Sequence, residues 1–460
     1  MNNDAVAVRK AGAPQLALAI LFAAASLSIV ALTLQGLESI WLRFAALGLF
    51  FVCIFAGLHE RHFFNPYYLF SLTPLSLALY DYSFSTYYLS QLNKSTYYLG
   101  LLCIATFLVG LMVANRQRAG HGPNEHRCAR REEPLFYPLL FLGMLPVMYG
   151  VAIAPNVLLS GDLLGMGKYV GMMPMSSILM ICRYPALALA IKSKRKKRIA
   201  IALGCCIVAL VLSFNKTNLI FLLFSTIFPI KKYLLTNARS NRVFIVVCAL
   251  SAVVMVLSVT FYDSIRSNFN STEALIARGA SSSLPEPLML PYMYLVSAWS
   301  NLQFVIETQP SHTFGLWLLR PLLFYFRIDG FFDGSYQLVA SSSYNTFTYI
   351  ACLWKDFGFV GAPVVSCGLG LFVGRVYQKS RKSSSPFSLS AYALVAVAVC
   401  EMFFSNHFFS LVYPFTACII AMLCDALVAR PSKLEKAKLD EAGQADRVRI
   451  DNEGDLAFNG

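Results

Sequence analysis

Arginine and aromatic side chains gather in one stretch of this sequence, residues 262–355. The cations of the stretch are Arg266, Arg278, Arg320, Arg327 and Lys355. An arginine side chain donates two parallel hydrogen bonds to a phosphate and stays charged, while aromatic rings such as that of Trp299 can stack on sugars. The combination indicates a surface for a phosphate-bearing glycan. Each residue taken singly also fits an ordinary membrane interface, where aromatic residues collect and arginines extend toward water.

Two ionisable side chains are candidates for proton transfer. His312 lies within this stretch, and an imidazole suits general base chemistry near neutral pH. Glu401 lies in an apolar segment, where a charge is costly and is a functional candidate by default. The alternative for Glu401 is a carboxylate solvated at a helix end. Arg183, also in an apolar segment, either pairs with a carboxylate or extends to the surface.

Motifs for metal and nucleotide chemistry are missing from the sequence. The stretch 262–355 has no Asp-x-Asp pair, and the chain has no Walker motif and no Cys/His cluster at zinc spacing. The triplet Asp356-Phe357-Gly358 matches the DFG of protein kinases, but no glycine-rich loop or HRD accompanies it. We therefore expect neither a metal nor a cofactor.

The composition indicates the kind of protein that positions these candidate residues. Of the 460 residues, 57% are hydrophobic and only 13% are charged, whereas a soluble domain has roughly 25% charged residues. This predicts an all-α polytopic membrane protein, because only helices or closed barrels satisfy their backbone in lipid. The twelve cysteines lie mostly in apolar segments and do not resemble a disulfide framework.

A spanning helix needs about 20 apolar residues, and on this basis the sequence predicts twelve spans. The pair 199–214 and 218–230 has the alternative of a broken hairpin. The predicted spans are 14–34, 40–58, 64–80, 97–113, 135–152, 176–191, 199–214, 218–230, 243–261, 357–376, 388–404 and 408–428.

The basic residues predict the orientation. With the N-terminus inside, 28 of the 38 lysines and arginines fall in cytoplasmic segments, notably 192–198, 231–242 and 375–382. This matches the positive-inside rule, so both termini are predicted to be cytoplasmic. The same basic runs could be solvated faces, but their alternation with apolar spans favours topology. The net charge of +14 is therefore no sign of a nucleic-acid partner.

The stretch 262–355 is predicted to be a large outer loop between spans nine and ten. Its apolar parts, 288–305 and 314–326, lie in the interface, enter the membrane as re-entrant segments, or cross as a pair. Residues 1–429 then form one membrane domain. The polar segment 430–460 is expected to be a disordered cytoplasmic tail.

Several sequence segments resemble the Wzy-type oligosaccharide repeat unit polymerases. They are SYNTFTYI at 343–350, WKDFGFVG at 354–361, the glycines Gly368, Gly370 and Gly374 that follow, YLVSAWSN at 294–301 and FNKT at 214–217. The order of elements is also similar, with many helices, one large late outer loop and about three further spans.

The resemblance implies a glycosyltransferase at the outer leaflet of the bacterial cytoplasmic (inner) membrane. Such an enzyme transfers a growing glycan from polyprenyl diphosphate to the terminal sugar of an incoming lipid-linked repeat unit. It therefore works within the lipid bilayer on polyprenyl-diphosphate-linked glycans, and a chain-length regulator and a flippase of the same pathway are expected partners.

The implied chemistry gives the candidate residues their roles. The diphosphate needs cations as its charge develops, and Arg278, Arg320 and Arg327 are the expected ligands. Trp299, Asn345 and Lys355 are expected to complete the substrate site. A base must take the proton of the acceptor hydroxyl, for which His312, Glu401 and Asp329 are the candidates.

Two other functions fit the same sequence features. An O-antigen ligase hands the same donor to a different acceptor. A flippase or transporter of lipid-linked oligosaccharides is the alternative from another class, although the two halves of the chain show no repeat of the kind on which transporters are often built.

Overall fold

The computed structural model describes residues 39–60, 64–80, 92–116, 132–173, 175–213, 216–235, 286–309, 311–319, 346–405, 407–408 and 413–429. All regular structure in these ranges is helical, and none of it is strand. The predicted all-α class is confirmed for this part of the chain.

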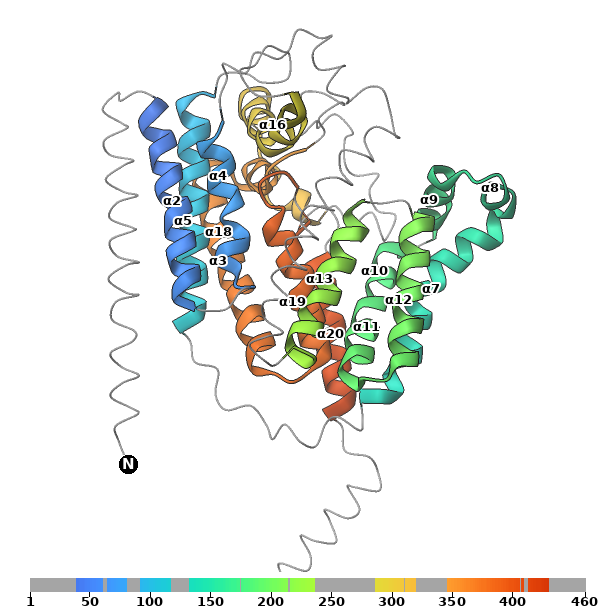
Figure 1. Ribbon diagram of the computed structural model, residues 1–460. Coiled ribbons are helices and arrows are strands. Elements are labelled where there is room, and N and C mark those ends of the chain that lie inside the picture. The colour runs from blue at the N-terminus through green and yellow to red at the C-terminus, as the bar shows by residue number, and fades with distance from the viewer. Residues whose placement is uncertain are drawn as a thin grey trace, which may run out of the picture.

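The helices are arranged as a bundle in which α2, α5 and α13 run roughly along one common axis (Figure 1). In chain order they are α2 (Ser39–Glu60), α3 (Pro66–Phe70), α4 (Leu72–Ala78), α5 (Lys94–Arg116), the 3-10 helix η2 (Glu133–Leu135), α7 (Phe136–Ile153), α8 (Pro155–Leu159), α9 (Leu163–Met172), α10 (Ser176–Ile181), α11 (Arg183–Ser193), α12 (Lys196–Ser213), α13 (Lys216–Tyr233), α16 (Glu286–Thr308), α18 (Tyr349–Lys382), α19 (Pro386–Cys400) and α20 (Tyr413–Ala429).

Four of the described helices are long and apolar enough to cross a membrane. They are Trp41–Glu60, Lys94–Arg116, Glu133–Ile153 and Tyr349–Lys382. A fifth candidate is the pair Gly165–Met172 and Ser176–Ser193, which is bent by 101°. These helices make the chain a membrane-embedded protein, but they do not confirm twelve spans. The predicted spans 14–34 and 243–261 lie outside the described residues.

Two predicted spans are broken into two helices each, and a proline explains each break. A proline has no N–H for the carbonyl four residues earlier and clashes with it. Pro74 stands four residues after Phe70, where α3 ends, and Pro185 stands four residues after Ile181, where α10 ends. In the pair 199–214 and 218–230, helices α12 and α13 are each continuous over 18 residues. The choice between two spans and a broken hairpin stays a prediction for this pair.

Helices α5 and α18 approach so closely that two of their glycines, Gly110 and Gly370, have no room for a side chain. A Cβ on Gly110 would lie 2.1 Å from the carbonyl oxygen of Cys367. One on Gly370 would lie 2.1 Å from the carbonyl oxygen of Phe107. Gly370 and Gly374 are four residues apart, the small-residue spacing by which membrane helices pack backbone against backbone.

Ion pairs and lysine–carbonyl contacts join the helix ends at one end of the bundle, which we call the basic end. The carboxylate of Glu132 pairs with Lys192 at 2.7 Å, and burial raises the pKa of Glu132 while the Lys192 ammonium opposes that rise. The other pairs are Arg195 and Arg198 with Glu133, Arg381 with Glu60 and Lys379 with Asp425.

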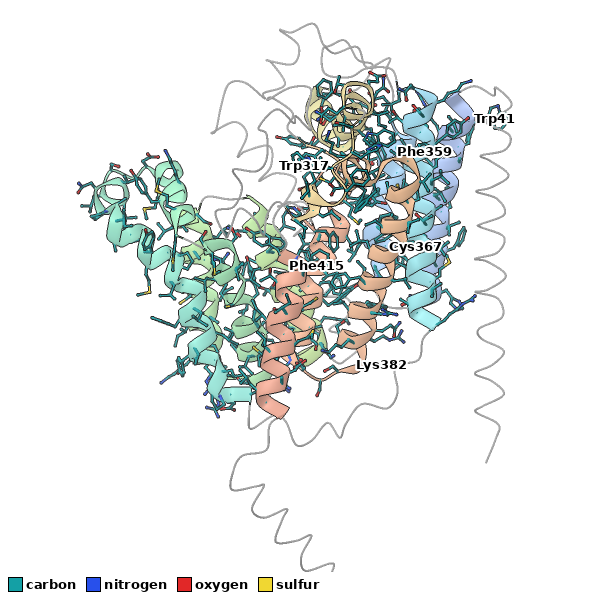
Figure 2. All side chains as sticks on the ribbon, turned by 180° about the vertical axis from the view of Figure 1, so that it is seen from behind. Trp41, Trp317, Phe359, Cys367, Lys382 and Phe415 are labelled. Atoms are coloured by element: carbon teal, nitrogen blue, oxygen red, sulfur yellow. The ribbon has the colours of Figure 1, made fainter. Side chains whose placement is uncertain are left out.

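Further contacts bring the end of α13 and the end of α5 to the same place. Lys232 donates to the carbonyl oxygens of Ser380 and Ser383, and Gln378 donates to Asn115 at 2.9 Å. Figure 2 follows α18 from Phe359 near Trp317, through Cys367, to Lys382 at the basic end. The structure thus confirms that the basic segments at 192–198, 231–232 and 375–382 share one end. Which side of the membrane they face stays a prediction.

Helix α16 lies across the opposite end of the bundle. Figure 1 shows it almost along its axis, whereas α2, α5 and α13 run up the page. Its side chains are tied to neighbouring helix ends: Tyr292 donates to the carbonyl of Leu79 at 3.0 Å, and Gln303 accepts from the backbone N–H of Asn93 at 2.7 Å. The segment 288–305 therefore does not cross with the bundle, and of the second apolar segment only 314–319 is described.

Candidate functional site

A buried arginine begins helix α11. Arg183 is only 1% exposed. Its backbone packs directly against Gly143 of α7, where a Cβ would lie 2.6 Å from the Arg183 backbone nitrogen. Its Nη2 donates to the Tyr184 hydroxyl at 2.9 Å. Its Nε and Nη1 have no hydrogen-bond partner among the described residues. Arg183 therefore neither pairs with a described carboxylate nor reaches the surface, the two outcomes that its sequence suggested.

A carboxylate and an imidazole form a second buried polar group. Helix α19 ends at Cys400, and Glu401 follows in a turn. The Nε2 of His407 contacts the Oε2 of Glu401. Both residues are 4% exposed, and Nδ1 of His407 has no partner in the described structure. The imidazole is thus oriented through one nitrogen while the other is left without a hydrogen bond.

One aromatic ring contacts both groups. The ring centroid of Phe221, on α13, lies 6.2 Å from that of Tyr184 and 5.8 Å from that of His407, with edge-to-face geometry in both cases. We call Arg183, Tyr184, Phe221, Glu401 and His407 the polar centre. It is assembled from α11, α13 and the turn after α19.

Helix lengths place the two charged groups at a similar depth. Helix α19 has 15 residues, so Glu401 lies about 22 Å from its start at ~1.5 Å per residue. Arg183 lies about 15 Å from the end of α11, and a helical side chain points back toward the helix N-terminus, which adds to that depth. Both residues are therefore set back from the basic end, by about 15 Å and 22 Å along their helices.

The segment 346–349 connects this centre to α16. The backbone N–H of Tyr349 donates to the carbonyl of Met402, beside Glu401, at 3.1 Å. Three residues earlier, the backbone carbonyl of Thr346 accepts a hydrogen bond from the Asn301 side chain at 2.6 Å. The hydroxyl of Thr346 lies 3.0 Å from the hydroxyl of Ser297. The start of α18 thus holds the Glu401 turn on one side and α16 on the other.

Lys355 and Asp356 hold the segment 311–319 against α18. Both side chains are fully buried, and Lys355 donates to the carbonyl of Ser311 at 2.9 Å. The Asp356 carboxylate accepts hydrogen bonds from the Thr313 hydroxyl at 2.5 Å and from the backbone N–H groups of Trp317 and Leu318 at 2.9 Å each. It thereby caps the helical turn at 316–319, as carboxylates do at helix N-termini.

His312 packs against a kink in α18. Its ring makes an edge-to-face contact with Trp354 at 5.4 Å, and a Cβ on Gly358 would lie 2.7 Å from its Nε2. Gly358 has φ +66 and ψ −162, a conformation essentially reserved for glycine. His312 therefore contacts the first part of α18, and no contact joins it to Glu401 in the described structure.

The other candidates divide into buried residues and residues outside the described ranges. Trp299 is fully buried, donates to the Ser76 hydroxyl at 2.9 Å and packs on Gly100, so its ring offers no face to a sugar. Lys355 is likewise turned inward to Ser311. Arg278, Arg320, Arg327, Asp329 and Asn345 lie outside the described residues, and their roles stay predictions.

The partner of Glu401 was missed by sequence reasoning. His407 stands six residues after Glu401, beyond the end of a helix, and this spacing matches no helical neighbour relation. The sequence did not indicate a role for Phe221 either, because nothing distinguishes it from the other phenylalanines among the 36 of the chain. A histidine closely following an intramembrane glutamate was the only available hint.

Replacing Asp356 with asparagine is expected to loosen the segment 311–319. The asparagine side chain keeps the shape of aspartate, but an NH2 group replaces one of the two carboxylate oxygens. This NH2 group cannot accept a hydrogen bond from the donors that face it, and each buried donor left without an acceptor costs about 1–3 kcal/mol of stability. Backbone amide hydrogen exchange in 311–319 should accelerate. Thr313→Val, which removes only one of the three hydrogen bonds, should have a smaller effect. Unchanged exchange in Asp356→Asn would show that the carboxylate does not hold this segment.

Comparison of the chain with protein-family models, with curated proteins and with solved structures gives no match.

Proposed function

We propose that this chain is a glycosyltransferase that polymerises polyprenyl-diphosphate-linked repeat units at the outer leaflet of the bacterial inner membrane. The observation that carries the proposal is the polar centre. The rings of His407, which contacts Glu401, and of Tyr184, which accepts a hydrogen bond from Arg183, both contact Phe221 inside a bundle of apolar helices. Two guanidinium nitrogens of Arg183 have no partner among the described residues. Glycosyl transfer from a diphosphate needs a base and a cation of this kind.

His407 is the proposed base. With its Nε2 proton donated to Glu401, its Nδ1 lone pair is available for the hydroxyl proton of the acceptor sugar. The hydroxyl oxygen then forms a bond to the anomeric carbon of the donor glycan. The bond between that carbon and the phosphate oxygen breaks, and the diphosphate leaves with the electron pair. Glu401 orients the imidazole and stabilises its charged form.

Arg183 is the proposed cation for the departing diphosphate. Removing an unpaired charge from water costs several kcal/mol even after relaxation, so an arginine kept in this state suits a ligand that supplies the negative charge. Arg278, Arg320 and Arg327 stay proposed ligands of the same diphosphate on the outer side.

The proposed orientation places the basic end in the cytoplasm, because positive residues are retained on that side. Both termini are then cytoplasmic, and twelve spans satisfy the alternation. The end with α16 and segment 311–319 faces outward, as part of the proposed outer loop 262–355. The site would therefore face the leaflet from which lipid-linked repeat units are consumed.

The glycan phenotype of a deletion strain tests this function against its alternatives. Loss of a polymerase should leave single repeat units on the surface lipid. Loss of an O-antigen ligase should instead strand polymer on the carrier lipid. Loss of a flippase should remove both from the outer surface. Polymer on the carrier in the deletion strain would refute the proposal.

Replacing Arg183 with methionine is expected to raise stability while it lowers transfer. Methionine has a similar length and removes a buried charge that has no carboxylate partner among the described residues, so the thermal midpoint of the purified protein should rise. Loss of a charge-assisted contact to the leaving group should slow transfer by about tenfold to a hundredfold. Arg183→Lys should restore part of the rate, because it keeps the charge without the fork. A lower midpoint in Arg183→Met would assign the arginine a structural role.

A further inference from the structure

The turn between α11 and α12 carries more positive charge than the described carboxylates beside it compensate. Segment 192–198 holds six cations, and the adjacent carboxylates are Glu132 and Glu133. Glu132 pairs with Lys192, and Arg195 and Arg198 share Glu133. Lys194, Lys196 and Lys197 are exposed, and none of them pairs with a described carboxylate. Three ammonium groups without a carboxylate partner among the described residues therefore lie within four positions of one another at the basic end.

The same turn continues directly into an apolar stripe. Four of the exposed residues of α12 stand four, seven, eleven and fourteen positions after Lys197, namely Ile201, Gly204, Val208 and Val211. This spacing puts them on one face of the helix. A Cβ on Gly204 would meet no atom within 4 Å, so the stripe is open above Gly204, between Ile201 and Val208.

The neighbouring helix α7 extends this surface. Tyr137 and Phe141 are 59% and 57% exposed near the start of α7, and Glu133, just before that start, holds Arg195 and Arg198 of the cationic turn. The guanidinium of Arg198 also lies 5.6 Å from the ring centroid of Phe136. Cationic groups thus stand beside apolar side chains that face outward from the bundle.

We propose that this surface binds an anionic phospholipid, with the headgroup on Lys194, Lys196 and Lys197 and an acyl chain along Ile201, Gly204 and Val208. The charges match an anionic headgroup, and polybasic segments beside membrane helices attract such lipids. The stripe from Lys197 to Val211 is about 21 Å long, enough for the ~15 Å of one leaflet's hydrocarbon. A soluble acidic protein would meet the lysines but not the stripe within the membrane. The lipid site is separate from the proposed polar centre.

Native mass spectrometry of the full-length detergent-purified protein tests the proposal. We expect tighter binding of phosphatidylglycerol than of phosphatidylcholine with the same acyl chains. The triple variant K194Q/K196Q/K197Q should bind phosphatidylglycerol about a hundredfold more weakly at low salt, at roughly fivefold per lysine. The triple lysine-to-arginine variant should retain binding, which separates loss of charge from loss of fold. The control K94Q/K168Q removes two exposed lysines outside the cationic turn and should leave binding unchanged.

Two further arms separate a lipid from a free anion or a protein. Gly204→Leu fills the open part of the stripe and should weaken phosphatidylglycerol binding, whereas a large excess of inorganic phosphate should not displace the lipid. Equal binding of both lipids by the wild type, or unchanged phosphatidylglycerol binding by the triple glutamine variant, would overturn the proposal. Displacement by phosphate together with an inert Gly204→Leu variant would overturn it in favour of a free-anion site. If the three lysines bound only an acidic protein, the triple glutamine variant would bind phosphatidylglycerol as the wild type does.

Discussion

Replacing His407 with glutamine should reduce repeat-unit transfer by about a hundredfold to ten-thousandfold, the usual contribution of a positioned general base. The glutamine amide can still donate to Glu401, so the buried carboxylate keeps a partner and the fold should survive. Alanine would be a poorer probe, because leaving one member of a buried pair alone costs about 3–5 kcal/mol by itself. The measurement is the glycan ladder of a strain that carries only the variant, with the amount of inserted protein determined in parallel.

Matched variants give this result its meaning. His59, exposed at the end of α2, is the control, and His59→Gln should leave the ladder unchanged. Glu401→Gln should lower transfer less than His407→Gln, because the imidazole remains but loses its orienting charge. His312→Gln tests the competing base. A wild-type ladder from His407→Gln, with a collapsed ladder from His312→Gln, would move the base to segment 311–319.

Replacing Gly370 with alanine should have the largest effect on folding. The added Cβ would lie 2.1 Å from the backbone oxygen of Phe107, and a backbone atom of a packed helix cannot turn aside as a side chain can. Helices α5 and α18 would have to separate along their length, and overpacking of a packed interior usually costs about 1–3 kcal/mol or more. The yield of monodisperse protein after detergent extraction should fall sharply, and its thermal midpoint should drop.

The neighbouring glycine Gly368 supplies the control on the same helix. A Cβ there would meet nothing within 4 Å, so Gly368→Ala should behave as the wild type or slightly better, since alanine favours helix more than glycine does. Gly110→Ala should reproduce the Gly370→Ala defect from the other side of the contact, because its Cβ would lie 2.1 Å from the Cys367 oxygen. Equal behaviour of Gly368→Ala and Gly370→Ala would contradict the close approach of α5 and α18.

Separation of α5 and α18 should also disturb the proposed site. The start of α18 holds Met402, and with it the Glu401 turn, through the backbone N–H of Tyr349. The Tyr349 hydroxyl lies 3.0 Å from that of Ser366, which donates to the carbonyl of Cys103 on α5 at 2.7 Å. The glycine contact thus supports the positioning of Glu401 and His407.

The sequence by itself determined the helical class, the apolar character of the long helices and the shared end of the basic segments. Each of these properties is local. Hydropathy over about 20 residues indicates a membrane helix, and alternation of basic and apolar segments indicates which helix ends lie together. The helix breaks after Phe70 and Ile181 were within reach too, since Pro74 and Pro185 stand four residues after them.

Only the tertiary structure decided which polar groups meet. Trp299 donates a hydrogen bond to Ser76, which is 223 residues away in the sequence. Its ring, which was expected to stack on a sugar, is therefore part of the protein interior. Lys355 faces Ser311 for the same kind of reason. The pairing of Glu401 with His407, and the contact of Phe221 with both His407 and Tyr184, depend on where a helix stops and which helices pack beside it. Such contacts are set by where helices end and how whole helices pack, and no periodicity or composition of the segments themselves encodes them.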